Sequence, residues 1–186
     1  MISRFFRRGD ARRQSIETLH VRINAASRQA ALYAGLGVPD SVEGRFECLI
    51  LHVILVLRRL NRLPPPAADV AQDLVNSVFL QLDASLRELG VGDFGVPKRM
   101  KKLGAAFYGR ASGYDGALDA SDLPALRTAL ARNVLGSEAA GAAAGLGDYV
   151  QAADAALAQA DLDALLGEGP RFPEPDGFVA AAEAVR

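Results

Sequence analysis

One long apolar helix, closed by three consecutive prolines, constrains the fold of this chain most strongly. Its centre, residues 49–57, is uncharged, and the apolar side chains between Phe46 and Leu60 fall on nearly every side of a helical projection. Asp40 with Glu43 three residues later predicts a capping box at the start, and the prolines at 64–66 predict an end near Leu63. Such a helix must be buried, so we predict the central helix of a helical domain.

The rest of the chain shows the same helical spacing of apolar residues, without sustained alternation of the kind that strands need. We therefore predict an all-α fold, a single bundle of about five to seven helices. Besides the central helix, we expect helices over 15–34 and 67–89, one that starts at Pro97 and loosens near Gly109 and Gly113, one capped by Asp119 or Ser121 that reaches Val134, one over 148–160, and a short turn capped by Asp161.

Three regions follow from this pattern. Residues 1–14 form a basic N-terminal arm, residues 15–168 the helical domain, and residues 169–186 an extended or disordered C-terminal tail. Within the domain, the glycine-rich stretch 136–147 predicts a flexible connection.

Few residues are available for catalysis or metal binding. Cys48 is the only cysteine, and His20 and His52 are the only histidines, which excludes an intrachain disulfide and a four-ligand structural zinc site built from cysteine and histidine. Cys48 and His52 are four residues apart and share a helix face. They can form a reactive thiolate–imidazole pair, or they can be a small buried cysteine beside a buried, hydrogen-bonded histidine. We adopt the second interpretation and expect no enzyme activity, no cofactor and no metal.

The charge is divided unevenly along the chain. Residues 1–110 carry 17 Lys and Arg against 10 Asp and Glu, whereas residues 111–186 carry 4 against 12. Two explanations stay open: a basic surface meets an anionic partner, or the acidic half packs against the basic half. The arginine-rich residues 4–13 can likewise lie on an anionic membrane or remain a solvated tail.

No segment has the length of a signal peptide or of a bilayer-spanning helix, which needs roughly 20 apolar residues. We therefore expect a cytoplasmic protein, with peripheral attachment to a bacterial inner membrane as a further hypothesis.

A second basic cluster lies on the helix predicted to begin at Pro97. Lys98, Lys101 and Lys102 share one face, with Arg99 beside them, while Met100, Leu103 and Phe107 share another. The cluster suits RNA phosphate, anionic lipid or plain solvation.

The same region carries an ordered series of motifs: LRELGVGD at 86–93, VPKRMKK at 96–102, AFYGR at 106–110, and then Tyr114. This series resembles the ubiquinol–cytochrome c chaperone family, and the resemblance covers roughly residues 33–135.

The resemblance implies an assembly chaperone for the respiratory cytochrome bc1 complex. Its expected partners are newly made cytochrome b or another bc1 subunit, a ribosome and a small partner protein, together with an anionic membrane surface; DNA is not expected. A competing hypothesis is a ribosome- or RNA-binding module that acts on translation.

We assign partner contacts and turn structure to separate sets of residues. The partner-binding candidates are Lys98, Arg99, Lys101 and Lys102, because they form a basic cluster, and Tyr108 and Arg110, because aromatic and arginine side chains are enriched at interfaces. The residues expected to shape the turn before the helix are Gly90, Gly92, Asp93 and Pro97.

Overall fold

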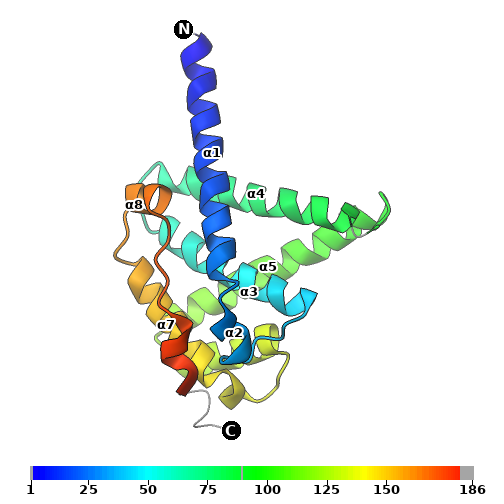
Figure 1. Ribbon diagram of the computed structural model, residues 1–186, viewed down its shortest axis with the longest axis vertical. Helices are drawn as coiled ribbons and strands as arrows, with labels where there is room; N and C mark the ends of the chain where they lie inside the picture. The colour runs from blue at the N-terminus through cyan, green and yellow to red at the C-terminus, as the bar shows by residue number, and fades with distance from the viewer. Residues whose placement is uncertain (1, 89, 181–186) are drawn as a thin grey trace.

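The structure, a computed structural model, describes the backbone of residues 2–88 and 90–180 and the side chains of residues 12–88 and 90–180. Helices account for all regular structure in this part of the chain, which confirms the all-α prediction (Figure 1). Among the described residues there are eight α-helices, two of which have only five and six residues: α1 Ile2–Ala26, α2 Ala30–Ala34, α3 Val42–Leu60, α4 Ala67–Glu88, α5 Gly95–Asp119, α6 Leu123–Leu130, α7 Ala144–Leu157 and α8 Leu162–Gly167. Three short helical segments join them: the π-helical η1 Ala131–Leu135 and the 3-10 segments η2 Ala140–Ala143 and η3 Pro175–Phe178.

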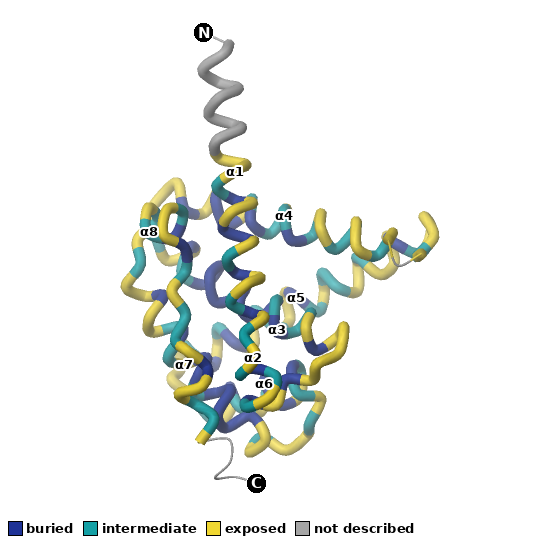
Figure 2. The backbone as a smooth tube through the Cα atoms, viewed as in Figure 1, coloured by how far each residue is buried: buried dark blue, intermediate teal, exposed yellow. Residues whose placement is uncertain are grey.

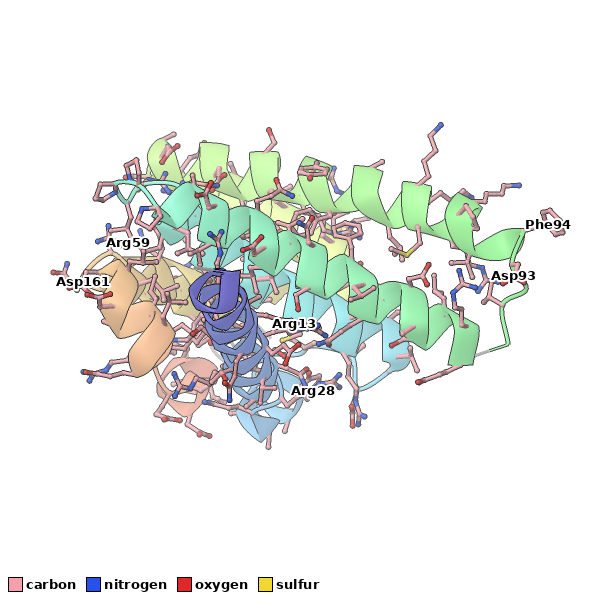
Figure 3. All side chains as sticks on the ribbon, turned by 90° about the horizontal axis from the view of Figure 1, so that it is seen from above. Arg13, Arg28, Arg59, Asp93, Phe94 and Asp161 are labelled. Carbon is pink, nitrogen blue, oxygen red and sulfur yellow. The ribbon has the colours of Figure 1, made fainter. Side chains whose placement is uncertain are left out.

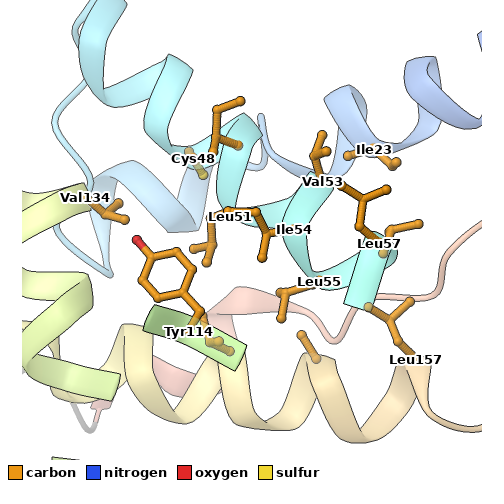
Figure 4. Close-up of a cluster of buried hydrophobic side chains, with 14 of the residues drawn as sticks. Ile23, Cys48, Leu51, Val53, Ile54, Leu55, Leu57, Tyr114, Val134 and Leu157 are labelled. Carbon is orange, nitrogen blue, oxygen red and sulfur yellow. The ribbon is translucent and has the colours of Figure 1, made fainter. Parts of the chain in front are cut away.

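Helix α3 is the centre of the bundle, as its apolar surface predicted. Twelve of its 19 residues are buried, and it packs against α1, α4, α5 and α7. Leu51, Leu55 and Ile54 are at most 2% exposed and point from α3 into the surrounding core (Figure 4). Burial on several faces of one helix is what orders the other helices around it.

The start of α3 lies slightly beyond the predicted cap. Ser41, rather than Asp40, is the N-cap, and its Oγ accepts a hydrogen bond from the Gly44 N–H at 3.0 Å. Asp40 instead accepts a hydrogen bond from Arg45 at 2.5 Å. The helix ends at Leu60, ahead of the prolines, which cannot continue its hydrogen-bond ladder.

The first predicted helix is divided in two. Residues 27–29 separate α1 from α2, and the Tyr33 hydroxyl donates to the Ser27 carbonyl oxygen at 2.7 Å, which fixes the break. Helix α1 already begins at Ile2, so helix continues into the predicted arm. The side chains of Arg4, Arg7 and Arg8 lie outside the described residues, and both hypotheses about them stay predictions.

Helices α4 and α5 form an antiparallel hairpin that projects from the body of the molecule (Figures 1 and 2). The buried residues of α4 lie between Ala67 and Val78, and Leu82 and Leu86 farther along are only half-buried. Helix α5 continues unbroken through Gly109 and Gly113, so the expectation that it loosens there is wrong.

The C-terminal third differs from its prediction in two places. Asp122, not Asp119 or Ser121, caps α6 by accepting from the Ala125 N–H at 2.9 Å. The stretch 136–147 is not a flexible connection throughout, because η2 and the first turn of α7 occupy it and residues 143–147 are buried. Asp161 caps α8 as predicted.

Candidate functional site

The Cys48–His52 pair lies inside the core. Both side chains are fully buried, with the sulfur 3.9 Å from Nδ1 of His52. Nδ1 is 2.8 Å from the Cys48 carbonyl oxygen, so it carries the hydrogen and donates, while Nε2 accepts from the Tyr149 hydroxyl at 2.8 Å. The interpretation of His52 as a buried, hydrogen-bonded histidine is confirmed.

Burial also sets the protonation of this pair. It lowers the pKa of His52 to about 4 and raises the pKa of the Cys48 thiol to about 12. At neutral pH the imidazole and the thiol are therefore both uncharged, and the geometry suits packing rather than a thiolate nucleophile. No cluster of three or more histidine, cysteine or acidic side chains suited to a metal occurs among the described residues.

A groove lies between α3, α4 and α5. It has a volume of about 670 Å³. Apolar side chains line its interior, namely Ile54, Leu57, Ala71, Val75, Phe107 and Ala111. Polar side chains complete the lining, namely Arg58, Asn61, Gln72, Tyr108, Ser112 and Asp115. A lining that combines apolar and polar side chains in similar numbers is suited to a segment that carries both apolar and polar groups.

Arg58 fixes one end of this groove. Its side chain is 5% exposed, and it donates to Asp154 at 2.8 Å, to Asp119 at 2.7 Å and to Asp115 at 3.1 Å. Burial alone would lower the pKa of Arg58, but these hydrogen bonds outweigh it and raise the pKa. The Arg58 hydrogen bond in turn lowers the pKa of Asp119. Sequence reasoning missed this cluster. The signal was available, because Arg58 and Arg59 directly follow the uncharged apolar residues 49–57, and a cation at the end of a buried helix needs acidic partners.

The four basic candidates near the start of α5 are all exposed. Lys98, Arg99, Lys101 and Lys102 take part in no ion pair among the residues that the structure describes. On the other side of the helix, Met100 and Leu103 are half-buried and Phe107 is buried, which confirms the predicted two faces. These cations are therefore free to meet an external anion.

Tyr108 and Arg110 have different surroundings. Tyr108 is 61% exposed at the groove, with its ring edge-on to Phe107 at 5.3 Å between centroids. Arg110 donates to Glu47 at 2.5 Å, and both side chains are largely buried. Tyr108 is thus placed for a contact with a partner, whereas the charge of Arg110 is already paired within the fold.

The turn before α5 has the expected glycine geometry. Gly90 has a φ of +79°, the left-handed conformation that favours glycine, and the Gly92 carbonyl oxygen accepts from the Gly95 N–H at 2.7 Å. Asp93 pairs with Arg87 at 2.7 Å, not with Lys98 or Arg99, and does not cap α5. Pro97 is the third residue of α5 rather than the first, since the helix begins at Gly95.

Phe94, which sequence reasoning did not select, is the most exposed aromatic residue described. Its side chain is fully exposed at the tip of the hairpin and points away from the molecule (Figure 3). A phenylalanine between turn glycines was visible in the sequence, but only the projecting hairpin shows that nothing covers it.

The model of the ubiquinol–cytochrome C chaperone family matches residues 34–172. The chain belongs to this family. The match runs past the region of resemblance through α7 and α8, so the family covers the groove, the hairpin and the Arg58 cluster together.

A solved structure supports the same relationship. The chain is similar to the Cbp3 homolog from Brucella abortus, with 41% sequence identity, a TM-score of 0.83, and coverage of 95% of this chain and 98% of the other. No curated protein matches the chain. Among the described residues of this family member, no helix has the length and apolar character needed to cross a bilayer.

Proposed function

We propose that this protein is an assembly chaperone for the respiratory cytochrome bc1 complex and that it assists newly made cytochrome b. Membership of the ubiquinol–cytochrome c chaperone family carries the proposal. The relative of 41% identity, which is described as a Cbp3 homolog, extends the support to nearly the full chain. No catalytic residue is assigned, because a chaperone acts through binding.

The groove between α3, α4 and α5 is the best site for the client. Its apolar interior can cover part of an apolar client segment that would otherwise aggregate in water. The exposed Tyr108 and the polar groups at the rim can hydrogen-bond to polar atoms of the same segment. The buried Arg58 holds α3, α5 and α7 together, so the groove is present before a client binds.

The test is loss of the protein followed by complementation. Deletion is expected to lower mature cytochrome b and bc1 activity together; normal levels of both would contradict the proposal. Ala68, exposed on α4 and lining the groove, is the position to block, by Ala68→Trp. The matched control is Ala84→Trp, on the same helix but outside the groove. We expect the control to restore both levels and the groove variant to fail.

The exposed cations of α5 favour a second candidate, a ribosome- or RNA-binding module that acts on translation. Such a module would bind ribosomes with a steep salt dependence, whichever message is translated. Co-sedimentation with ribosomes that translate cytochrome b or an unrelated protein separates the candidates: equal binding to both favours the module, and preference for cytochrome b favours the chaperone. A small partner protein, which the family resemblance implies, would co-purify in either case.

A further inference from the structure

One face of α5 combines aromatic and basic side chains along its exposed length. Phe94 is the helical N-cap residue directly before α5, and Lys98, Lys101, Lys102 and Tyr108 lie 4, 7, 8 and 14 residues after it. At 3.6 residues per turn these positions fall within about 120° of one another, on one side of the helix. All five are exposed. The distance along the axis from Phe94 to Tyr108 is roughly 21 Å at the rise of an α-helix. Aromatic groups thus stand at both ends of a basic stripe.

The charge of this stripe is not neutralised within the molecule. Helix α5 contains no acidic residue before Asp115. On the neighbouring end of α4, Arg87 pairs with Asp83 at 2.6 Å and with Asp93 at 2.7 Å, and Glu88 is exposed. The described ion pairs leave Lys98, Arg99, Lys101 and Lys102 unpaired, in contrast to Arg58, Arg62 and Arg110 of the body. A surface of this sign attracts an anionic partner.

Phe94 indicates which kind of anionic partner fits. Its ring is fully exposed at the end of the projecting hairpin and makes no ring contact with another described residue (Figure 3). Proteins that bind single-stranded nucleic acid place aromatic side chains along a positively charged groove, where successive bases stack on them. A ring that stands free at a tip can instead enter the boundary between lipid headgroups and acyl chains, while lysines behind it remain at the level of the phosphates.

We propose that this α5 face docks the protein on an anionic lipid surface, with Phe94 inserted and Lys98, Arg99, Lys101 and Lys102 at the headgroups. Tyr108, at the far end of the stripe, also lines the groove between α3, α4 and α5. Docking therefore brings one rim of the groove close to the membrane surface. The proposal does not depend on the identity of the client.

A single tryptophan provides a direct test, because the chain contains none. Phe94→Trp places the reporter at the tip, and Leu80→Trp is the matched control, at a side chain 71% exposed on α4. The probes are phosphatidylcholine vesicles with and without phosphatidylglycerol. We expect the fluorescence of the tip Trp to shift to the blue and to be protected from quenching by acrylamide when anionic vesicles are added, and salt should reverse both effects. The control Trp, and vesicles without phosphatidylglycerol, should give neither effect. An unchanged spectrum of the tip reporter with anionic vesicles overturns the proposal.

Charge variants test the basic stripe by vesicle co-sedimentation. Each cation near an anionic surface changes partitioning about fivefold, so changing all four of Lys98, Arg99, Lys101 and Lys102 to Gln should reduce binding roughly 600-fold. The control changes four exposed arginines elsewhere to Gln, namely Arg13, Arg28, Arg132 and Arg171. Phe94→Ala should weaken binding about tenfold.

Outcomes against the proposal are equally definite. Equal binding by the stripe variant and the arginine control would show general charge attraction and would overturn it. A shift of the Trp reporter with RNA but not with vesicles would assign the face to a nucleic acid. The thermal midpoint of the stripe variant should match that of the wild type, since these side chains have no described partner within the fold; if it does not fold, the Trp reporter decides alone.

Discussion

His52 shows how this protein accommodates a polar residue in its most apolar helix. Both ring nitrogens have partners, the Cys48 carbonyl on one side and the Tyr149 hydroxyl on the other, so the neutral ring is fully satisfied. The pair with Cys48 follows from the helical repeat and could be predicted from sequence. Tyr149, which lies 97 residues away, could not, because nothing local in the sequence links α3 with α7.

The buried neutral state of His52 predicts a loss of stability in acid. The folded pKa of about 4 lies below the ordinary value of 6.5, so the unfolded chain binds the proton first. The contribution of neutral His52 to the free energy of unfolding is complete above pH 6.5. It is lost as the pH falls from 6.5 to 4, by about 3 kcal/mol in total. Urea unfolding at a series of pH values measures this dependence.

Two variants separate His52 from the other histidine. Burial also lowers the pKa of His20, whose Nδ1 lies 3.3 Å from the Ser77 hydroxyl, so it adds acid sensitivity of the same sign. His52→Gln should reduce the pH dependence of the free energy of unfolding between pH 6.5 and 4 more than His20→Gln does. An unchanged dependence in His52→Gln would contradict the buried neutral histidine.

At the scale of helices, the sequence predicted which segments are helical but located their ends less well. The α3 cap shifts by one residue because Ser41 and Asp40 are both good capping residues, and local chemistry does not choose between them. Helix α5 persists through its glycines because burial of Phe107, Tyr114 and Ala117 outweighs a propensity cost of about 1 kcal/mol for each glycine. The helix expected over 67–89 is present as α4, but its apolar spacing cannot show that the helix leaves the body beyond Val78.

Glycines in α3 and α5 should respond to alanine in opposite directions. A Cβ at Gly44 would lie 2.0 Å from the Pro39 carbonyl oxygen, a backbone atom that cannot easily move. Gly44→Ala should therefore destabilise the protein by about 2 kcal/mol despite its better helix propensity. At Gly109 no atom from outside the local helix backbone lies within 4 Å of an added Cβ, so Gly109→Ala should stabilise by up to about 1 kcal/mol. Thermal and urea unfolding of both variants check the signs, and stabilisation by Gly44→Ala would contradict the close approach.

Across the whole molecule, the acidic and basic halves of the chain meet in one place and separate in another. Arg58, from the basic half, is surrounded by Asp115, Asp119 and Asp154 of the acidic half, so internal packing explains part of the charge division. The cations near the start of α5 have no such partners among the described residues, and there the anionic-partner explanation stays a prediction. The residue counts showed that residues 1–110 are basic and residues 111–186 acidic, but they could not show where the two halves pack together and where basic side chains remain unpaired.

The C-terminal segment closes the core from the far end of the chain. The Phe172 ring meets His52 edge-on at 4.8 Å between centroids, and the Phe178 ring meets Tyr149 at 5.7 Å. An extended or disordered tail was expected over residues 169–186. Residues 169–174 are without helix, but η3 at Pro175–Phe178 is helical and Pro175 is buried, so the expectation is wrong for that part of the tail. What the sequence did not show is that its aromatic rings cover the buried histidine, since a contact over 120 residues leaves no periodic signal.

Removing the Phe172 ring should therefore weaken the fold and expose His52 together. Phe172 is half-buried, so Phe172→Ala should cost about 2 kcal/mol, less than a fully buried phenylalanine. Water admitted beside the imidazole would relieve its desolvation and raise the His52 pKa from about 4 toward 6.5. The neighbouring Arg171→Ala is the control, because that side chain is 83% exposed and its loss should change stability by less than about 0.5 kcal/mol. Urea unfolding and an NMR titration of the His52 ring measure both effects; a destabilised variant with an unmoved His52 pKa would mean that the ring supports the fold without shielding the histidine.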